Sequence, residues 1–179
     1  MRRFAQFADE RKLVSIRRKK IDPNSIQGFV LGYSDDLVLI QYVYDFRLDG
    51  LTILRTTDIT DIRCNATDEF QKQLLVDEQL LQEVPFGTAF DLSDWRSIIT
   101  QLSRKYRLMI LEDEKAKPQQ FLIGTIDKIT ARSVWLRHFS GAGNWDNKPT
   151  NLLFKEITAC QVATNYLNVY ERYFDRHVP

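Results

Sequence analysis

A run of four consecutive basic residues is the clearest candidate for ligand chemistry in this chain. The run comprises Arg17, Arg18, Lys19 and Lys20. Lys and Arg side chains bind phosphate groups, so the run could contact a nucleic acid. A solvated protein face would carry the same residues, and both interpretations stay open.

The charge around this run is uneven, although the net charge of the chain is only +1. Residues 1–20 hold eight Lys and Arg against two acidic residues, whereas residues 68–94 hold seven acidic residues against Lys72 alone. A basic segment can be a nucleic-acid footprint. The acidic segment could equally be its internal or intersubunit partner.

Aromatic residues supply a second candidate site. Tyr42, Tyr44 and Phe46 alternate along one predicted strand, and Trp145 lies in a segment rich in Gly and Asn. Such residues usually pack into a core, but aromatic side chains are also enriched at interfaces. We expect any binding surface where Tyr42, Tyr44, Arg47 and Trp145 converge.

The sequence predicts no catalytic, metal or cofactor site. The sequence contains two histidines, His138 and His177, and two cysteines, Cys64 and Cys160. None of these four residues stands in a spacing typical of metal ligands or of a disulfide framework. Motifs of nucleophilic hydrolases, phosphate-binding loops and dinucleotide-binding folds are absent from the sequence. We therefore expect a protein that is not an enzyme.

The longest apolar runs, such as 37–40, are too short to cross a bilayer, and no apolar stretch follows Arg2 and Arg3. We expect no membrane contact and a cytoplasmic location.

The chain repeats itself. Residues 26–41 recur without a gap 96 residues later, at 122–137, and residues 58–62 recur at an offset of 98. Two copies of one fold explain such a match. Because Pro85-Phe86-Gly87 breaks the chain between them, we predict domains at 1–87 and 88–179.

Each copy is predicted to contain a short amphipathic helix, five strands and a closing helix. The repeated core is a pair of strands, at 25–33 with 37–46 and again at 120–129 with 133–139. Asp49-Gly50 predicts a hairpin turn after the first pair.

The first copy resembles the Sm-like family of small SH3-like barrels. Ile26-Gln27-Gly28-Phe29-Val30 is similar to the family's first motif, and Ile53-Leu54-Arg55 opens a segment similar to its second. The resemblance implies a five-stranded barrel and a nucleotide pocket to which Arg55 would contribute. Here Thr56 stands where the family has glycine.

These observations predict a mainly β, α+β chain of two tandem five-stranded barrels packed as a pseudo-dimer. We expect a non-catalytic protein-interaction or regulatory module with a protein partner. Single-stranded RNA binding is the alternative, an unrecognised enzyme is the third, and a homo-oligomer is also open.

Overall fold

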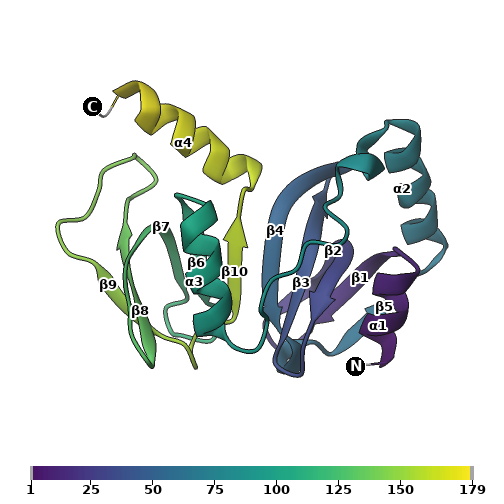
Figure 1. Cartoon of the computed structure of the whole chain (residues 1–179), viewed down its shortest axis with the longest axis horizontal. Helices are drawn as coiled ribbons and strands as arrows, with labels where there is room; N and C mark the ends of the chain where they lie inside the picture. The colour runs from purple at the N-terminus through teal and green to yellow at the C-terminus, as the bar shows by residue number, and fades with distance from the viewer. Residues whose placement is uncertain (1, 178–179) are drawn as a thin grey trace. The chain divides into compact units, whose positions relative to one another are not determined.

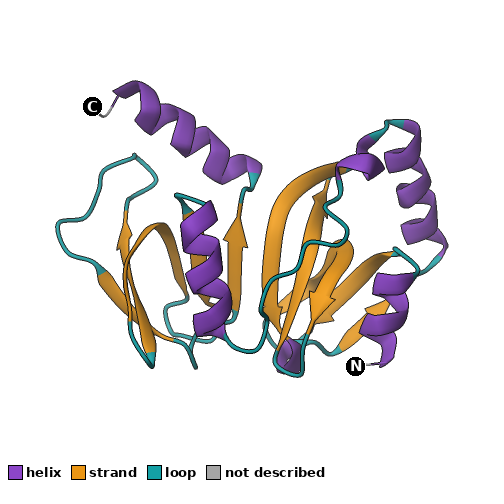
Figure 2. Ribbon diagram, viewed as in Figure 1, coloured by secondary structure: helices purple, strands orange, loops and turns teal. Residues whose placement is uncertain are grey.

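The chain is an α+β protein in which strands dominate, as the sequence predicts (Figure 2). A computed structural model describes residues 2–177, and in that range it contains ten strands, four α-helices and two short 3-10 helices. The chain divides into two compact units, and the division falls between Ser93 and Asp94. In each unit an α-helix precedes five strands and another α-helix follows them.

Unit 1 begins with α1 (Arg2–Asp9) and continues with five antiparallel strands (Figure 1). The strands are β1 (Leu13–Arg18), β2 (Asp22–Tyr33), β3 (Leu37–Tyr44), β4 (Arg47–Arg55) and β5 (Asp61–Arg63). They pair in the order β5-β1-β2-β3-β4. The short helix η1 (Thr56–Asp58) connects β4 to β5, and α2 (Ala66–Asp77) and η2 (Leu80–Glu83) follow β5.

Unit 2 has the same order of elements. It begins with α3 (Trp95–Lys105) and ends with α4 (Asn165–His177). Its strands are β6 (Met109–Asp113), β7 (Gln120–Ile129), β8 (Ser133–His138), β9 (Thr150–Leu153) and β10 (Ala159–Val162). They pair antiparallel in the order β10-β6-β7-β8-β9.

The closed Sm-like barrels expected from the sequence are wrong. The strands form open antiparallel sheet, because β4 and β5 stand at opposite ends of the strand order in unit 1 and do not pair. The same holds for β9 and β10 in unit 2. The short motif around Gly28 indicates a close crossing of two strands, which open sheets also contain, and it carries no information about closure.

The close crossing itself is present at equivalent places in both units. Gly28 pairs with Tyr42, and Gly124 pairs with His138. A Cβ on Gly28 would overlap the carbonyl oxygen of Gln41 on the neighbouring strand, and one on Gly124 would overlap a carbonyl in the same way. Only a residue without a side chain fits there.

Both sheets also carry a bulge at matching positions. The register between β2 and β3 shifts between Val30 and Gly32, and that between β7 and β8 shifts between Ile126 and Lys128. Each bulged strand gains an extra residue and a stronger local bend. The two shifts are 96 residues apart, as are the repeated segments.

The hairpin expected at Asp49-Gly50 is wrong. The turn between β3 and β4 is formed by Asp45 and Phe46, and Gly50 lies inside β4 with a positive φ of 72°. A bulge there interrupts the register between Gln41 and Val43. Asp-Gly favours positive φ, and a bulge requires this as much as a turn does.

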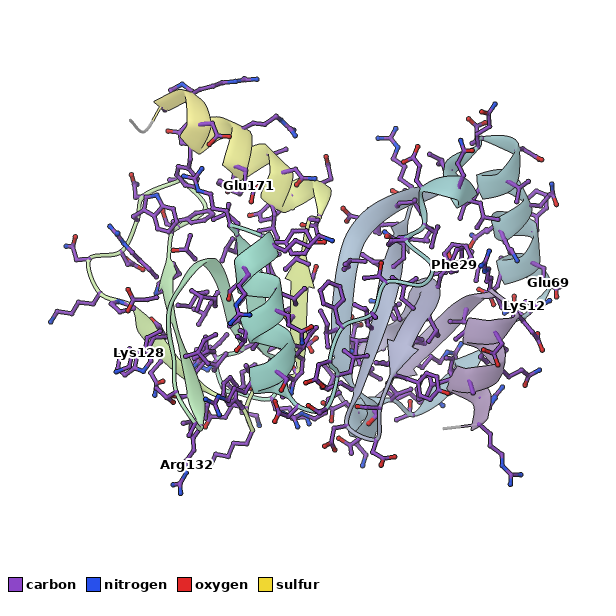
Figure 3. All side chains as sticks on the ribbon, viewed as in Figure 1. Lys12, Phe29, Glu69, Lys128, Arg132 and Glu171 are labelled. Carbon is purple, nitrogen blue, oxygen red and sulfur yellow. The ribbon has the colours of Figure 1, made fainter. Side chains whose placement is uncertain are left out.

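Each unit has its own apolar core. In unit 1, Phe29 is fully buried and packs with residues of β1, β3 and α2 (Figure 3). In unit 2, helix α4 contributes Leu167 and Phe174, which pack on residues of β6 and β7. Burial of these apolar side chains is the main force that holds each sheet against its helices.

Candidate functional site

The β3–β4 hairpin of unit 1 ends in an exposed aromatic turn. Tyr44 is 58% exposed and Phe46 is 52% exposed. Asp45 and Phe46 both have positive φ, 46° and 61°, as in a type I′ hairpin turn. Such turns favour Asn and Gly, because a Cβ is disfavoured in this conformation. A phenylalanine held there is strained, and strained residues cluster at functional sites.

Tyr42 extends this surface along β3. Its ring centroid lies 6.1 Å from that of Tyr44, with a tilt of 41° between the rings. Burial raises the pKa of the Tyr42 phenol, and the carboxylate of Asp49 raises it further. The hydroxyl is thus protonated at neutral pH, in a region of negative potential. We call Tyr42, Tyr44 and Phe46 the aromatic cluster.

A cavity of about 650 Å³ opens beside the aromatic cluster. Its walls come from residues 22–27 of β2, from the β3–β4 turn, and from the chain between β5 and the first turns of α2. Three carboxylate side chains and one guanidinium line it. They are Asp22, Asp45, Asp68 and Arg63.

Asp68 anchors the inner wall of this cavity. It is 1% exposed, and its Oδ1 accepts hydrogen bonds from Ser15 Oγ at 2.6 Å and Gln27 Nε2 at 2.9 Å. Its Oδ2 accepts the backbone N–H of Asn65 at 2.9 Å. The Asn65 side chain in turn accepts the N–H groups of Thr67 and Asp68, which completes a capping box. The start of α2 is therefore satisfied by protein groups.

Two polar atoms of the cavity residues have no hydrogen-bond partner among the described residues. They are Nε of Arg63 and Oε1 of Gln71, and both are buried from solvent. Buried polar groups are nearly always paired in native proteins. One unpaired donor and one unpaired acceptor therefore belong to residues that line the same cavity.

The basic run does not form a single exposed face. Arg18 is only 4% exposed and Arg17 is half-buried, whereas Lys19 and Lys20 are exposed just after β1. Arg17 and Arg18 are adjacent in β1 and point to opposite faces, so these two cations cannot both face one ligand.

Other cations of the N-terminal segment are paired within unit 1. Lys12 Nζ lies 3.1 Å from Glu69 Oε1, and the two side chains lie side by side in Figure 3. Arg3 lies 3.4 Å from Asp61. Glu69 belongs to the acidic segment 68–94, so this part of that segment is an internal partner of the basic one.

The remaining predicted residues lie apart along their elements. Arg47 is exposed at the first position of β4, where it pairs with Tyr44. Arg55 is half-buried at the other end of β4. Trp145 belongs to unit 2 and packs against Phe139, with ring centroids 5.0 Å apart. Packing in its own core, the alternative weighed from the sequence, accounts for this indole.

The structure also shows a polar chain that sequence patterns missed. His138 Nε2 lies 2.9 Å from Thr150 Oγ1, and His138 Nδ1 lies 2.7 Å from Asp146 Oδ2. A hydroxyl, a histidine and a carboxylate follow one another in this order in hydrolytic triads. Here Asp146 also donates its backbone N–H to the His138 carbonyl at 2.9 Å, so the chain of contacts closes the 140–149 loop. No sequence spacing links these residues, because the loop alone brings them together.

Within residues 2–177, no group of three or more His, Cys, Asp or Glu side chains is arranged to hold a metal ion. None of the helices in that range combines the length and apolar character that a membrane span needs.

Cys160 is buried, and burial raises the pKa of its thiol well above the usual range. Cys64 is half-buried, and its thiol pKa is raised by burial and then by Asp68.

No family model, no curated protein and no solved structure matches this chain. The resemblance to Sm-like proteins is therefore unsupported by comparison as well as by the open sheet. The candidate site rests on the geometry of unit 1 alone.

Proposed function

We propose that this chain is a non-catalytic protein-interaction module and that the aromatic cluster of unit 1 is its docking site. The observation that carries the proposal is the exposed aromatic turn, in which Phe46 is 52% exposed at a φ of 61°. Tyr and Phe are enriched at interfaces because they bury a large area with few rotatable bonds. A strained backbone that holds such a ring in solvent costs folding free energy. Burial of the ring against a partner would offset that cost.

Single-stranded RNA binding has less support. It needs exposed cations beside stacking aromatic rings. Arg18 is buried, Lys12 is paired with Glu69, and carboxylates outnumber cations in the cavity beside the aromatic cluster. Anionic phosphates would be repelled there.

A random peptide library displayed on phage tests the docking proposal. We expect the intact protein to enrich binding peptides, and Tyr44→Ala with Phe46→Ala to lose them, because truncation of aromatic anchors usually costs more than about 1 kcal/mol of binding free energy. The matched control is Phe70→Ala, on α2, whose side chain is 63% exposed outside the cavity.

Three results would decide the question. Peptides that bind the intact protein and the control but not the double variant support the proposal. Peptides that bind all three proteins place the docking site elsewhere. Binding of a single-stranded RNA that Lys19→Glu with Lys20→Glu abolishes would favour the RNA alternative.

We further propose that the two units arose by internal duplication. The same order of elements, the close crossings at Gly28 and Gly124 and the bulges at matching positions support it. The cytoplasmic location expected from the sequence stays a prediction.

A further inference from the structure

The chemistry of the docked partner follows from the cavity beside the aromatic cluster. Three carboxylates, of which Asp68 is buried and hydrogen-bonded, and one guanidinium line the cavity, and the exposed Arg47 follows the turn without lining the cavity. The charged groups of the lining are therefore predominantly negative. Asp45 lies exposed in the turn between Tyr44 and Phe46, and Asp22 lies on the facing segment of β2. A cationic ligand would be attracted to this surface and an anionic one repelled.

The aromatic rings favour the same kind of ligand. The faces of Tyr and Phe rings attract cations, and this attraction adds to the pull of nearby carboxylates. Tyr42 and Tyr44 border the cavity with ring centroids 6.1 Å apart, and Phe46 borders it as well. The rings can cover the methylene groups of a long side chain while its charged end meets the carboxylates.

Two unpaired polar atoms of the cavity residues also fit a basic peptide ligand. Gln71 Oε1 is an unpaired acceptor, and rotation of the Gln71 side chain toward the cavity would let a guanidinium or ammonium N–H satisfy it. Arg63 Nε is a buried donor that suits a peptide carbonyl. The start of α2 offers no competing anion site, because Asn65 and Asp68 already cap it.

We propose that this cavity binds an arginine or lysine side chain of the partner, so that the module recognises a basic protein segment. The inference rests on the proposed docking function and adds the chemical class of the partner. The aromatic cluster provides the contact area, and Asp22, Asp45 and Gln71 select the cation.

The test is a titration of the full chain with capped single amino acids, followed by two-dimensional amide NMR. The probes are N-acetyl-L-argininamide and its neutral counterpart N-acetyl-L-citrullinamide, which has nearly the same shape without the charge. We expect the arginine probe to shift the amide signals of Asp45, Phe46 and Gln71. We expect the citrulline probe to bind at least about threefold more weakly, the size of a modest cation–π and charge contribution.

Variants locate the site. Tyr44→Leu and Asp45→Asn are each expected to weaken binding of the arginine probe by at least about threefold. Their controls are Phe121→Leu and Asp127→Asn in unit 2, one with an exposed ring and one with an exposed carboxylate, which should leave binding unchanged. Amide spectra of each free variant show that it is folded.

Equal binding of the two probes, shifts that avoid unit 1, or binding that Tyr44→Leu and Asp45→Asn do not alter would overturn the cationic ligand. The peptide selection separates this failure from that of the docking proposal. Peptides that need Tyr44 and Phe46 but show no enrichment of Arg or Lys leave the docking site standing and reject only the basic partner. A selection that yields no such peptides rejects both.

Discussion

Phe46 carries a backbone cost that its own packing does not offset. Its positive φ of 61° is a conformation in which a side chain costs about 1–2 kcal/mol, and glycine avoids most of this cost. The ring recovers little of that cost by packing, because it is 52% exposed. A residue that is poor for the fold and accessible to a partner is explained best by the partner.

Replacement of Phe46 by glycine tests this balance. We expect Phe46→Gly to raise the free energy of unfolding by up to about 1 kcal/mol, because glycine adopts positive φ without steric cost. The same change should abolish binding of the selected peptides. Urea denaturation measures the stability. Asp45→Gly is the control for stability, because it relieves the positive φ of the neighbouring residue and keeps the Phe46 ring. A loss of stability in Phe46→Gly would mean that the ring serves the fold.

Asp68 carries a different kind of residue-scale role, since it links three elements. Its side chain holds Ser15 of β1, Gln27 of β2 and the start of α2. We expect Asp68→Ala to lower the free energy of unfolding by about 2–4 kcal/mol, because it removes a cap and leaves buried donors unpaired. Asp77→Ala, at the exposed end of the same helix, should change it by less than about 0.5 kcal/mol in the same denaturation experiment. Equal effects of the two changes would contradict the role given to Asp68.

At the scale of elements, the close crossings of β2 with β3 and of β7 with β8 shape the sheets. Gly28 and Gly124 let the backbones approach until a Cβ would overlap a carbonyl oxygen. The adjacent bulges bend the same strands. Together these devices set how far β2 and β7 curve, and the start of β2 forms one wall of the cavity in unit 1.

Alanine at either crossing is expected to destabilise its unit. Gly28→Ala and Gly124→Ala should each lower the free energy of unfolding by about 1–3 kcal/mol, because the strands must move apart. Gly141→Ala is the matched control, since its Cβ would meet open space and should cost less than about 0.5 kcal/mol. Thermal unfolding followed by circular dichroism gives the comparison. If all three variants melt alike, the crossings are not tight in solution.

Much of this element pattern could be predicted from the sequence. The strands at 120–129 and 133–138 agree with the prediction to within one residue, because segments rich in apolar and β-branched residues and bounded by polar turns indicate strands. The hairpin turn predicted at Asp49-Gly50 was wrong, because this dipeptide indicates a residue with positive φ, and both turns and bulges contain such residues. Whether the five strands of a unit close into a barrel also could not be predicted, since closure depends on whether the strands at the two ends of the strand order pair.

The site was predicted only in part, for a physical reason. The aromatic residues of β3 are local in sequence, so a strand pattern could find Tyr42 and Tyr44. Asp68 meets Ser15 across 53 residues, and no local pattern contains that contact. Within the basic run Arg18 is buried, which its long apolar stem tolerates, and a binding role for the run stays a prediction.

At the scale of the whole molecule, the division into two units governs how changes spread. Each unit has its own five strands, helices and apolar core. Changes at Gly28 or Asp68 should act mainly on unit 1, and changes at Gly124 on unit 2, because distant sites contribute independently to stability. The docking proposal likewise concerns unit 1 alone.

The rates at which the two cysteines are alkylated can be compared between the two units. The chain has two, and Cys64 lies in unit 1 while Cys160 lies in unit 2. Cys160 is buried, so it reacts with iodoacetamide only when its surroundings in unit 2 open, whereas the half-buried Cys64 serves as the reference thiol in unit 1. Gly124→Ala should speed the labelling of Cys160 about fivefold or more and leave Cys64 nearly unchanged. Mass spectrometry of tryptic peptides would measure both labelling rates in one sample, and equal acceleration of both thiols would show that the effect of the change is not confined to unit 2.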